Sequence, residues 1–290
     1  TDLTSLTAEV TCDPADAIVR FDPLKPSADD GQKKLEQGNA LQTEDFSVPR
    51  ICNVEYQGQI NSYTVTVIIP VYKPDEKFRK LMNGLKRQTY PIKEILIMNT
   101  EKEYWKYAWI QGIENVRVEH LKKEEFDHGG TRARAAAMST GNILVFFTQD
   151  AVPADEHVVE ELVKAFQDPR VGAAYGRQLA DKDCRIIEKY TRSFNYPAES
   201  SIKSKEDLPE LGIKTFFCSN VCAAYKRSTF EELGGFITHT IFNEDMIFAG
   251  RLILNGGSVA YRADAKVIHS HNYNCRQQFK RNFDLAVSQA

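Results

Sequence analysis

The sequence lacks any long apolar run. Its longest apolar stretches, Val65–Tyr72 and Ile143–Phe147, are far shorter than the ~20 residues that a membrane-spanning helix needs. The opening residues, Thr1–Val10, also lack the basic start and apolar core of a signal peptide. We therefore expect no transmembrane segment and a cytoplasmic location.

A strong excess of charge of one sign is also missing. The 37 basic and 40 acidic side chains give a net charge of −3, which gives no support for binding to nucleic acid. Residues 1–60 hold 11 acidic and 5 basic side chains, which leaves a net charge of +3 on the rest of the chain. A mildly basic body suits an anionic ligand.

Cysteine is sparse. None of the six cysteines lies in a Cys-x-x-Cys motif, which argues against a zinc knuckle or a thioredoxin-like site. We expect reduced and mostly buried thiols, as in cytosolic proteins.

The chain has two parts of different character. Residues 1–62 contain two Asp-Pro pairs, Pro26 and a polar run from Asp29, which are typical of turns and loops. We expect this part to be an N-terminal extension or linker without a core of its own. The hydrophobic share of 42% is that of a globular protein, so residues 63–290 are predicted to form one domain.

Strand and helix patterns alternate from Thr64 onward. The β-branched run Val65–Ile69 predicts a buried strand that ends at Pro70. Apolar residues at helical spacing in Asp75–Gln88 predict a helix with one buried face. Such alternation predicts an α/β fold with a mostly parallel, twisted sheet. Further strands are expected at 94–98, 115–121, 143–147 and 171–175, and further helices at 133–140 and 155–167.

The alternation loosens after Tyr175. The polar stretch Lys182–Gly212 is predicted to be a long loop or a small subregion. Short strands are expected at 221–225, 258–261 and 266–269. A capping box at Ser228–Glu231 predicts a short helix, and Asn243 is expected to cap another helix that ends near Leu254.

Polar side chains follow several of the predicted strands. Ligands of open parallel sheets bind beyond the carboxyl ends of the strands, where Tyr72, Asn99 and Asp150 are expected. A carboxylate such as that of Asp150 suits Mg²⁺ or Mn²⁺. The alternative is a turn or helix-capping aspartate before Pro153.

Two further clusters allow more than one interpretation. Glu244 and Asp245 are expected at the start of a helix. They are either acidic residues that the helix dipole favours there, or one of them is a general base. His269 and His271 lie on one face of a strand, as structural residues or as metal ligands. The glycines before Arg132 are expected to precede a helix, either at a phosphate or in a plain turn.

The order of these motifs carries more information than each alone. The succession VIIPVYK, FDHGGTRARAAA, VFFTQDAVP, LGGF, NED and HSH resembles the inverting family 2 glycosyltransferases with the GT-A fold. The FDHGGTR and TQDA segments are similar to those of bacterial rhamnosyltransferases that use dTDP-L-rhamnose. The similarity covers Thr64–Ala290.

The resemblance implies a role for individual residues. Asp245 matches the catalytic base, and Asp150 matches the last acidic position of the DxD metal motif. A histidine of the HSH motif completes the metal or pyrophosphate site in related enzymes. The implied donor contacts are Pro70, Val71, Tyr72, Asn99, Arg132, Gln149 and Asp150; the implied acceptor contacts are Asn220 and Glu244; the implied metal ligands are Asp150, His269 and His271.

The sequence departs from the family pattern at two positions. Thr148 replaces the first carboxylate of the metal motif, and Asn99 replaces an aspartate that contacts the base. These departures keep open an alternative: a GT-A-like module that binds a glycan or nucleotide-sugar in a polysaccharide assembly without catalysis. A nucleotidyltransferase would need a Gly/Arg-rich phosphate loop after the first strand, which Val71–Lys77 does not supply.

The resemblance also implies partners. These are a nucleotide-sugar donor, a glycan or lipid-linked acceptor, and peripheral contact with the inner face of a membrane. The basic, amphipathic tail Cys275–Ala290 is predicted either to contact lipid or to pack on the domain as a terminal helix.

Overall fold

The computed structural model describes residues 63–289 and, within residues 1–62, the backbone of five short strands. The chain divides into two compact units, Thr1–Tyr63 and Thr64–Ala290, and each is described by itself. The prediction that residues 1–62 have no core of their own lies outside the described residues. In the first unit β1 (Leu6–Val10) pairs with β3 (Ala40–Glu44), and β4 (Ile51–Tyr56) pairs with β2 (Ile18–Asp22) and β5 (Gln59–Ile60), all antiparallel.

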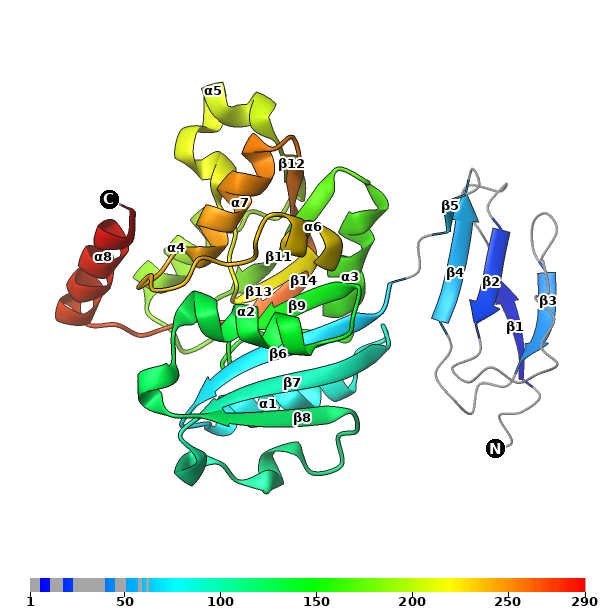
Figure 1. Ribbon diagram of the computed structural model, residues 1–290, viewed down its shortest axis with the longest axis horizontal. Helices are drawn as coiled ribbons and strands as arrows, with labels where there is room; N and C mark the ends of the chain where they lie inside the picture. The colour runs from blue at the N-terminus through cyan, green and yellow to red at the C-terminus, as the bar shows by residue number, and fades with distance from the viewer. Residues whose placement is uncertain are drawn as a thin grey trace. The chain divides into compact units, whose positions relative to one another are not determined.

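The second unit is built on one twisted mixed sheet (Figure 1). Its described strands have the order β10-β14-β11-β13-β9-β6-β7-β8, with β12 paired to β14. The pairings give β6, β7, β8, β9, β11 and β14 one direction and β10, β12 and β13 the opposite one. The predicted α/β fold with a mostly parallel sheet is confirmed. The bounds are β6 Val65–Tyr72, β7 Ile92–Thr100, β8 Val116–Leu121, β9 Ile143–Phe147, β10 Val152–Pro153, β11 Val171–Leu179, β12 Ser201–Lys203, β13 Cys222–Lys226 and β14 Ser258–Ile268.

Helices pack against this sheet, with α2 on β6 and β7, α3 on β11 and β14, and α7 on β14 (Figure 1). Among the residues described, no helix is both long and apolar enough to span a membrane. The α-helices are α1 Glu76–Lys86, α2 His128–Met138, α3 Val158–Lys164, α4 Ile186–Asn195, α5 Leu208–Leu211, α6 Arg227–Glu232, α7 Glu244–Leu254 and α8 Cys275–Gln289. The 3-10 helices are η1 Lys102–Tyr104, η2 Tyr107–Ile110, η3 Lys123–Glu125, η4 Ala165–Gln167, η5 Lys205–Asp207 and η6 Gly212–Phe216.

The first strand of this sheet is longer than its sequence predicted. β6 continues through Pro70 to Tyr72. Its pairing with β9 ends at Ile68, before the proline. Beyond that point β6 is paired only with β7, and a proline is tolerated in a strand that has a partner on one side. The extension carries Tyr72 to the same edge of the sheet as the end of β7.

An aromatic cluster holds α6 and α7 against the sheet. Phe230 and Phe236 lie 4.9 Å apart between ring centroids, and Tyr225 and Phe248 lie 5.2 Å apart. Phe146 of β9 packs against the same rings. Truncation of such a buried ring costs about 3–5 kcal/mol. The cluster therefore fixes the first turn of α7, with Glu244 and Asp245, relative to β9 and β13.

The stretch Lys182–Gly212 is a folded subregion and not a long loop. It contains α4, β12 and α5. Glu188 and Arg192 form an ion pair of 2.6 Å on the half-buried side of α4, whereas Ile186 and Ile187 are 82% and 76% exposed. The apolar residues of α4 recur at helical spacing, but the side of the helix that they form is exposed and not buried.

Three other boundaries differ from the sequence prediction. The two strands expected in 258–269 are one strand, β14, with an irregularity opposite Gly176–Arg177. Lys226, not Ser228, precedes α6, so Ser228 lies inside the helix and the predicted capping box is absent there. α2 begins at His128, so both glycines of the HGGT segment lie in its first turn, and it ends at Met138 before Gly141.

Candidate active site

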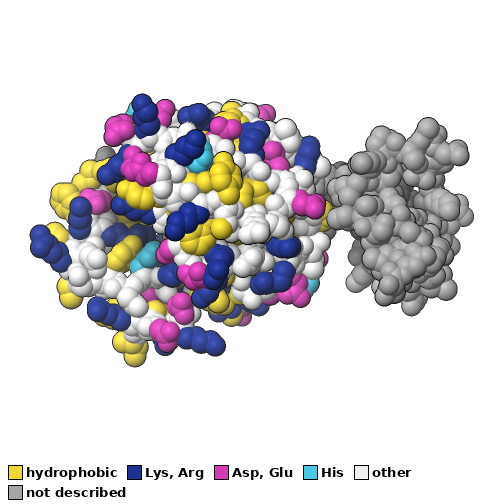
Figure 2. Space-filling view, turned by 90° about the horizontal axis from the view of Figure 1, so that it is seen from below, with side chains coloured by type: hydrophobic (Ala, Val, Ile, Leu, Met, Phe, Trp, Pro, Cys, Tyr) yellow, Lys and Arg dark blue, Asp and Glu magenta, His cyan; other side chains and the backbone are white. Residues whose placement is uncertain are grey.

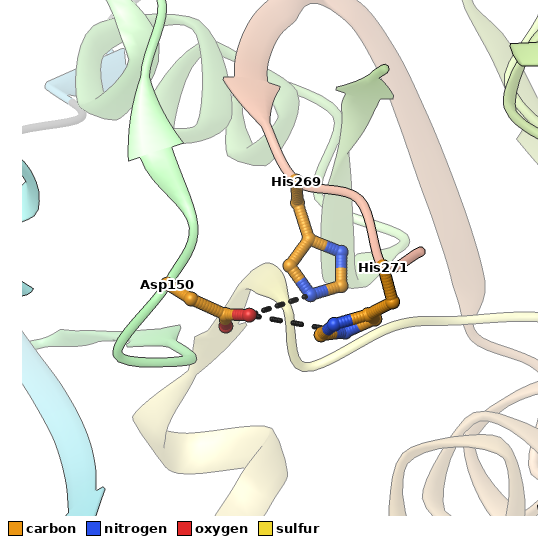
Figure 3. Close-up of side chains that lie close together, drawn as sticks. All are labelled: Asp150, His269 and His271. Atoms are coloured by element: carbon orange, nitrogen blue, oxygen red, sulfur yellow. Dashed lines mark ion pairs between the residues drawn. The ribbon is translucent and has the colours of Figure 1, made fainter. Parts of the chain in front are cut away.

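The structure brings Asp150, His269 and His271 together at one edge of the sheet (Figure 3). Asp150 lies in the turn after β9, which is closed by a hydrogen bond from the amide of Ala151 to the carbonyl of Thr148. His269 follows β14, and its amide donates to Leu179 of β11. Oδ2 of Asp150 lies 3.5 Å from Nε2 of His269 and 3.8 Å from Nε2 of His271.

The chemistry of these three groups fits a divalent metal ion. Burial lowers the pKa of His269 to about 3, so its ring is neutral at pH 7. Its Nδ1 lies 2.9 Å from Oε1 of Gln178, an acceptor, so Nδ1 carries the hydrogen and Nε2 the lone pair. The lone pair thus faces a carboxylate oxygen with no hydrogen between them. Two ligands at about 2.1 Å from one ion lie at most about 4.2 Å apart, which accommodates both separations from Asp150.

Asp150 is ionised in this arrangement. Burial raises the pKa of its carboxyl group, but the positive charge that His269 and His271 carry when protonated, together with that of Lys77, brings the pKa below its usual value. A carboxylate and two neutral imidazoles are a ligand set that suits a transition-metal ion such as Mn²⁺ or Zn²⁺ better than Mg²⁺, which prefers oxygen ligands. The predicted metal ligands therefore form one candidate metal site.

A second acidic centre lies at the start of α7. Asn243 has the left-handed backbone conformation, with a φ of 70°, and turns the chain into the helix. The carboxylate of Asp245 accepts hydrogen bonds of 2.9 Å from the amides of Asn220 and Met246. Asp245 is half-buried as a residue, and these two donors fix its carboxylate in position.

Asp245 has an unusual proton affinity. Desolvation raises its pKa to about 7, and the neighbouring carboxylate of Glu244 adds to that effect. The two backbone donors and Arg132 oppose the shift without cancelling it. A carboxyl group with a pKa near neutrality exchanges a proton readily, as a general base requires.

Three of the predicted ligand contacts are buried beside Asp245. Glu244 accepts from the side chain of Asn220 at 3.0 Å and pairs with Arg132 at 3.2 Å. The side-chain oxygen of Asn220 accepts from the hydroxyl of Tyr225 at 2.8 Å. Arg132 is 4% exposed, and its Nε is buried without a partner among the described residues. These side chains contact one another, and the backbone amide of Asn220 contacts the carboxylate of Asp245.

The two centres lie at the same edge of the sheet. β9 and β13 are antiparallel neighbours, so the end of β9 meets the start of β13. The amide of Thr148 donates to the carbonyl of Val221, and Asn220, one residue earlier, holds Asp245. The turn that carries Asp150 is therefore tied to the segment that holds Asp245.

The predicted donor contacts at the ends of β6 and β9 are also linked to each other. The side-chain amide of Gln149 accepts from the backbone amide of Tyr72 at 2.8 Å and donates to its carbonyl at 3.0 Å. Val71 is buried, and the Tyr72 ring is 37% exposed and lies edge to face with Tyr104. Gln149 thus joins the ends of two strands and leaves Tyr72 at the surface.

Asn99 lies fully buried at the end of β7. Its Nδ2 is 2.9 Å from Nδ1 of His120 and donates to the carbonyl of Glu101, whereas its Oδ1 has no partner among the described residues. His120 and Glu101 also line a cavity of about 350 Å³. Asn99 itself is not among the residues that line this cavity.

A larger cavity of about 460 Å³ opens beside the candidate metal site. His271 and Ser270 line it together with Lys77, a cation that also lowers the pKa of Asp150. Asp181 and Asp183 also line it. The cavity offers space for a ligand that reaches the metal site.

The sequence did not reveal the role of the FDHGGTR segment. Asp127 caps α2 by accepting from the amide of Gly130, so that amide is not free for a phosphate. A Cβ on Gly129 would overlap the carbonyl oxygen of Ile237 and touch Glu244. Gly129 therefore allows the start of α2 to approach the backbone at Ile237, in the segment before α7. Arg132 of the same helix pairs with Glu244.

Comparisons with known proteins agree with this architecture. The profile of glycosyl transferase family 2 matches residues 66–234. The chain is 42% identical over 228 residues to the O-antigen chain rhamnosyltransferase RfbN of Salmonella typhimurium, covering 78% of this chain and 72% of that protein. It is 41% identical over 228 residues, with the same coverage, to the O-antigen chain rhamnosyltransferase WbaN of Salmonella anatum.

Solved structures share the fold at low sequence identity. The mannosyltransferase PcManGT from Pyrobaculum calidifontis, in complex with GDP-Man and Mn²⁺, has a TM-score of 0.57 at 19% identity, over 79% of this chain and 62% of that one. S. aureus TarS 1-349 in complex with UDP-GlcNAc has a TM-score of 0.56 at 15% identity, over 74% and 60%. These likenesses confirm the predicted GT-A fold. With a profile that covers more than half of the chain and relatives above 40% identity, the chain belongs to glycosyl transferase family 2.

Proposed function

We propose that this protein is an inverting rhamnosyltransferase that moves L-rhamnose from dTDP-L-rhamnose to a hydroxyl group of a growing or lipid-linked glycan. Two relatives above 40% identity are named O-antigen chain rhamnosyltransferases, which supports the sugar and the kind of acceptor. The observation that carries the proposal is the carboxylate of Asp245, held by two backbone donors at the same sheet edge as Asp150.

In this proposal Asp150, His269 and His271 hold Mg²⁺ or Mn²⁺ at the donor diphosphate. A bound divalent ion neutralises the charge that develops on the leaving group. The ligand set compensates for Thr148, which replaces the first carboxylate of the family motif, because the two histidines supply neutral ligand atoms. Lys77, which lines the cavity beside His271, would supply one positive charge near the diphosphate, whereas Asp181 and Asp183 add negative charge to the same lining.

Asp245 acts as the general base. Its carboxylate takes the proton from the acceptor hydroxyl as the oxygen attacks the anomeric carbon from the face opposite to the diphosphate. The bond from the anomeric carbon to the diphosphate oxygen breaks as the new glycosidic bond forms. One base is sufficient, because an inverting transfer has no covalent intermediate.

Arg132, Glu244 and Asn220 support this base. Their mutual hydrogen bonds fix the amide of Asn220 and the first turn of α7, which together hold the carboxylate of Asp245. Glu244 also keeps the pKa of Asp245 high. In this proposal Arg132, Glu244 and Asn220 influence the transfer by positioning Asp245.

The nucleotide is proposed to lie along the ends of β6 and β7. Pro70, Val71 and Tyr72 would border the base and ribose, with Gln149 fixing the backbone of Tyr72. Asn99, which is fully buried, would have to become accessible before its free Oδ1 could accept a hydrogen bond from the pyrimidine.

Peripheral contact with a membrane is part of the proposal. One side of α8 packs on the domain. There Arg281 lies over the ring of Phe242, and the backbone amide of Phe242 donates to the hydroxyl of Ser288. The other side exposes Phe279 and Phe283 at 73% and 60%. Figure 2 shows apolar and basic side chains interspersed at its left edge, the side on which Figure 1 draws α4 and α8. Apolar and basic groups together suit an anionic lipid surface.

Release of sugar from the donor separates this proposal from a non-catalytic binding module, which the substitutions at Thr148 and Asn99 would favour. The protein is incubated with dTDP-L-rhamnose, with and without Mn²⁺, and free rhamnose and dTDP are measured. We expect slow, metal-dependent hydrolysis that Asp150→Ala abolishes. Tight binding of the donor with no hydrolysis and no transfer to any glycan would leave the binding module as the better account.

A further inference from the structure

A buried glutamine lies behind the candidate metal site. Gln178, on β11, is 2% exposed, and both atoms of its side-chain amide are in use. Its oxygen is contacted by Nη1 of Arg192 and lies 2.9 Å from Nδ1 of His269. Its nitrogen donates to the hydroxyl of Ser219 at 3.0 Å and to that of Tyr196.

These contacts leave one orientation for the amide. A guanidinium group only donates, so the atom of Gln178 that faces Arg192 is the oxygen. The same oxygen faces His269, so Nδ1 of His269 must donate to it. A neutral imidazole carries one hydrogen, and its Nε2 is therefore free to bind a cation at Asp150.

The glutamine is itself held from α4. Arg192 pairs with Glu188 at 2.6 Å, and the same carboxylate accepts from the amide of His271. The half-buried side of α4 thus orders both histidines, one through Gln178 and one through its backbone.

We propose that Gln178 is a positioning residue that fixes the Nδ1–H tautomer of His269 and thereby sets the metal affinity of the site. The inference rests on the proposed metal site. The loss of an outer-shell partner of a metal-binding histidine typically weakens metal affinity about 10–100-fold.

Two substitutions separate this role from a purely structural one. Gln178→Leu removes the acceptor and should lower Mn²⁺ affinity about 10–100-fold. Gln178→Glu keeps an acceptor for both His269 and Arg192, and the hydroxyls of Ser219 and Tyr196 can rotate to donate to it. Gln178→Glu should bind Mn²⁺ at least as tightly as the wild type.

A matched control is available at the opposite end of the sheet. The buried hydroxyl of Thr66 bonds to Glu94 and to the amide of Gly141 near the start of β6. Thr66→Val therefore removes buried hydrogen bonds without touching the site, and its Mn²⁺ affinity should equal that of the wild type.

Two readouts test the proposal. Electron paramagnetic resonance titration gives the affinity for Mn²⁺ alone, and long-range ¹H–¹⁵N spectra of histidine-labelled protein give the tautomer, with His269→Gln to assign the signal. We expect Nδ1–H in the wild type and in Gln178→Glu, and loss of that preference in Gln178→Leu. An Nε2–H tautomer in the metal-free wild type, or a folded Gln178→Leu that binds Mn²⁺ within twofold of the wild type, would overturn the proposal.

The remaining outcomes are also decisive. If Gln178→Leu does not fold, Gln178→Glu decides, because a tenfold loss of Mn²⁺ affinity in that variant contradicts the role. If the wild type binds no Mn²⁺, the proposed metal site fails, and the tautomers of the metal-free proteins alone test what Gln178 does.

Discussion

Substitution of Glu244 by glutamine should move the pH dependence of transfer. The pKa of Asp245 is raised to about 7 by desolvation first and by the charge of Glu244 second. A base with that pKa is about a tenth ionised at pH 6, half ionised at pH 7 and nine-tenths ionised at pH 8. The kcat/KM of the wild type should therefore rise about tenfold from pH 6 to pH 8.

Glu244→Gln removes the neighbouring negative charge and leaves Arg132 without its partner. Both changes favour the ionised form of Asp245, so its pKa falls. A fall of about one unit raises the ionised fraction at pH 6 from about a tenth to about a half. The ratio of kcat/KM at pH 6 to that at pH 8 should increase about fivefold, even where the absolute rate decreases because the site is less ordered.

The assay is a set of pH–rate profiles for transfer, measured at saturating Mn²⁺. Glu231→Gln is the control, since Glu231 is an exposed partner of Arg227 and its loss should leave the profile unchanged. An acidic limb near pH 4 in the wild type, or an identical limb in Glu244→Gln, would refute the assignment of the limb to Asp245.

Further substitutions test other parts of the account. The raised pKa of Asp245 makes the folded protein lose stability as the pH rises from about 4 to about 7. Asp245→Asn should remove that loss, which denaturant titrations at the two pH values measure. If the variant loses as much free energy of unfolding between these pH values as the wild type, the pKa shift is contradicted. Gly129→Ala should separate α2 from Glu244 and lower both melting temperature and kcat, whereas unchanged kinetics would mean that the contact is unimportant. His271→Ala should weaken Mn²⁺ binding at least tenfold by calorimetry, and unaltered affinity would remove it from the ligand set. Phe279→Ser with Phe283→Ser should reduce co-sedimentation with anionic vesicles, and equal sedimentation would exclude α8 as the lipid contact.

The sequence predicted the main strands and the residues at their ends. β9 has the predicted bounds, Ile143–Phe147, because a short apolar run between polar residues has few alternatives in an α/β fold. Parallel strands end at one edge of a sheet, which is why Asp150 and His269, far apart in the chain, could be expected in the same place.

The supporting contacts could not be predicted, because they depend on pairs that are distant in sequence. Arg132 was expected at a phosphate, but its partner is Glu244, which the close approach of Gly129 makes possible. Gln178 lies inside a strand and has no local pattern that marks it, and its role depends on contacts with Arg192 and His269. α4 carries apolar residues at helical spacing, but the sequence does not show that this apolar side is exposed while the polar side is half-buried.

The central claim is that the carboxylate of Asp245 removes the acceptor proton while a metal ion at Asp150 holds the donor. The most direct measurement compares Asp245→Asn with the wild type in transfer from dTDP-L-rhamnose and in Mn²⁺-dependent donor binding. The account predicts that kcat falls about 10²–10⁴-fold, the usual contribution of a general base, while donor affinity stays within about threefold. A variant that transfers rhamnose at the wild-type rate would contradict it.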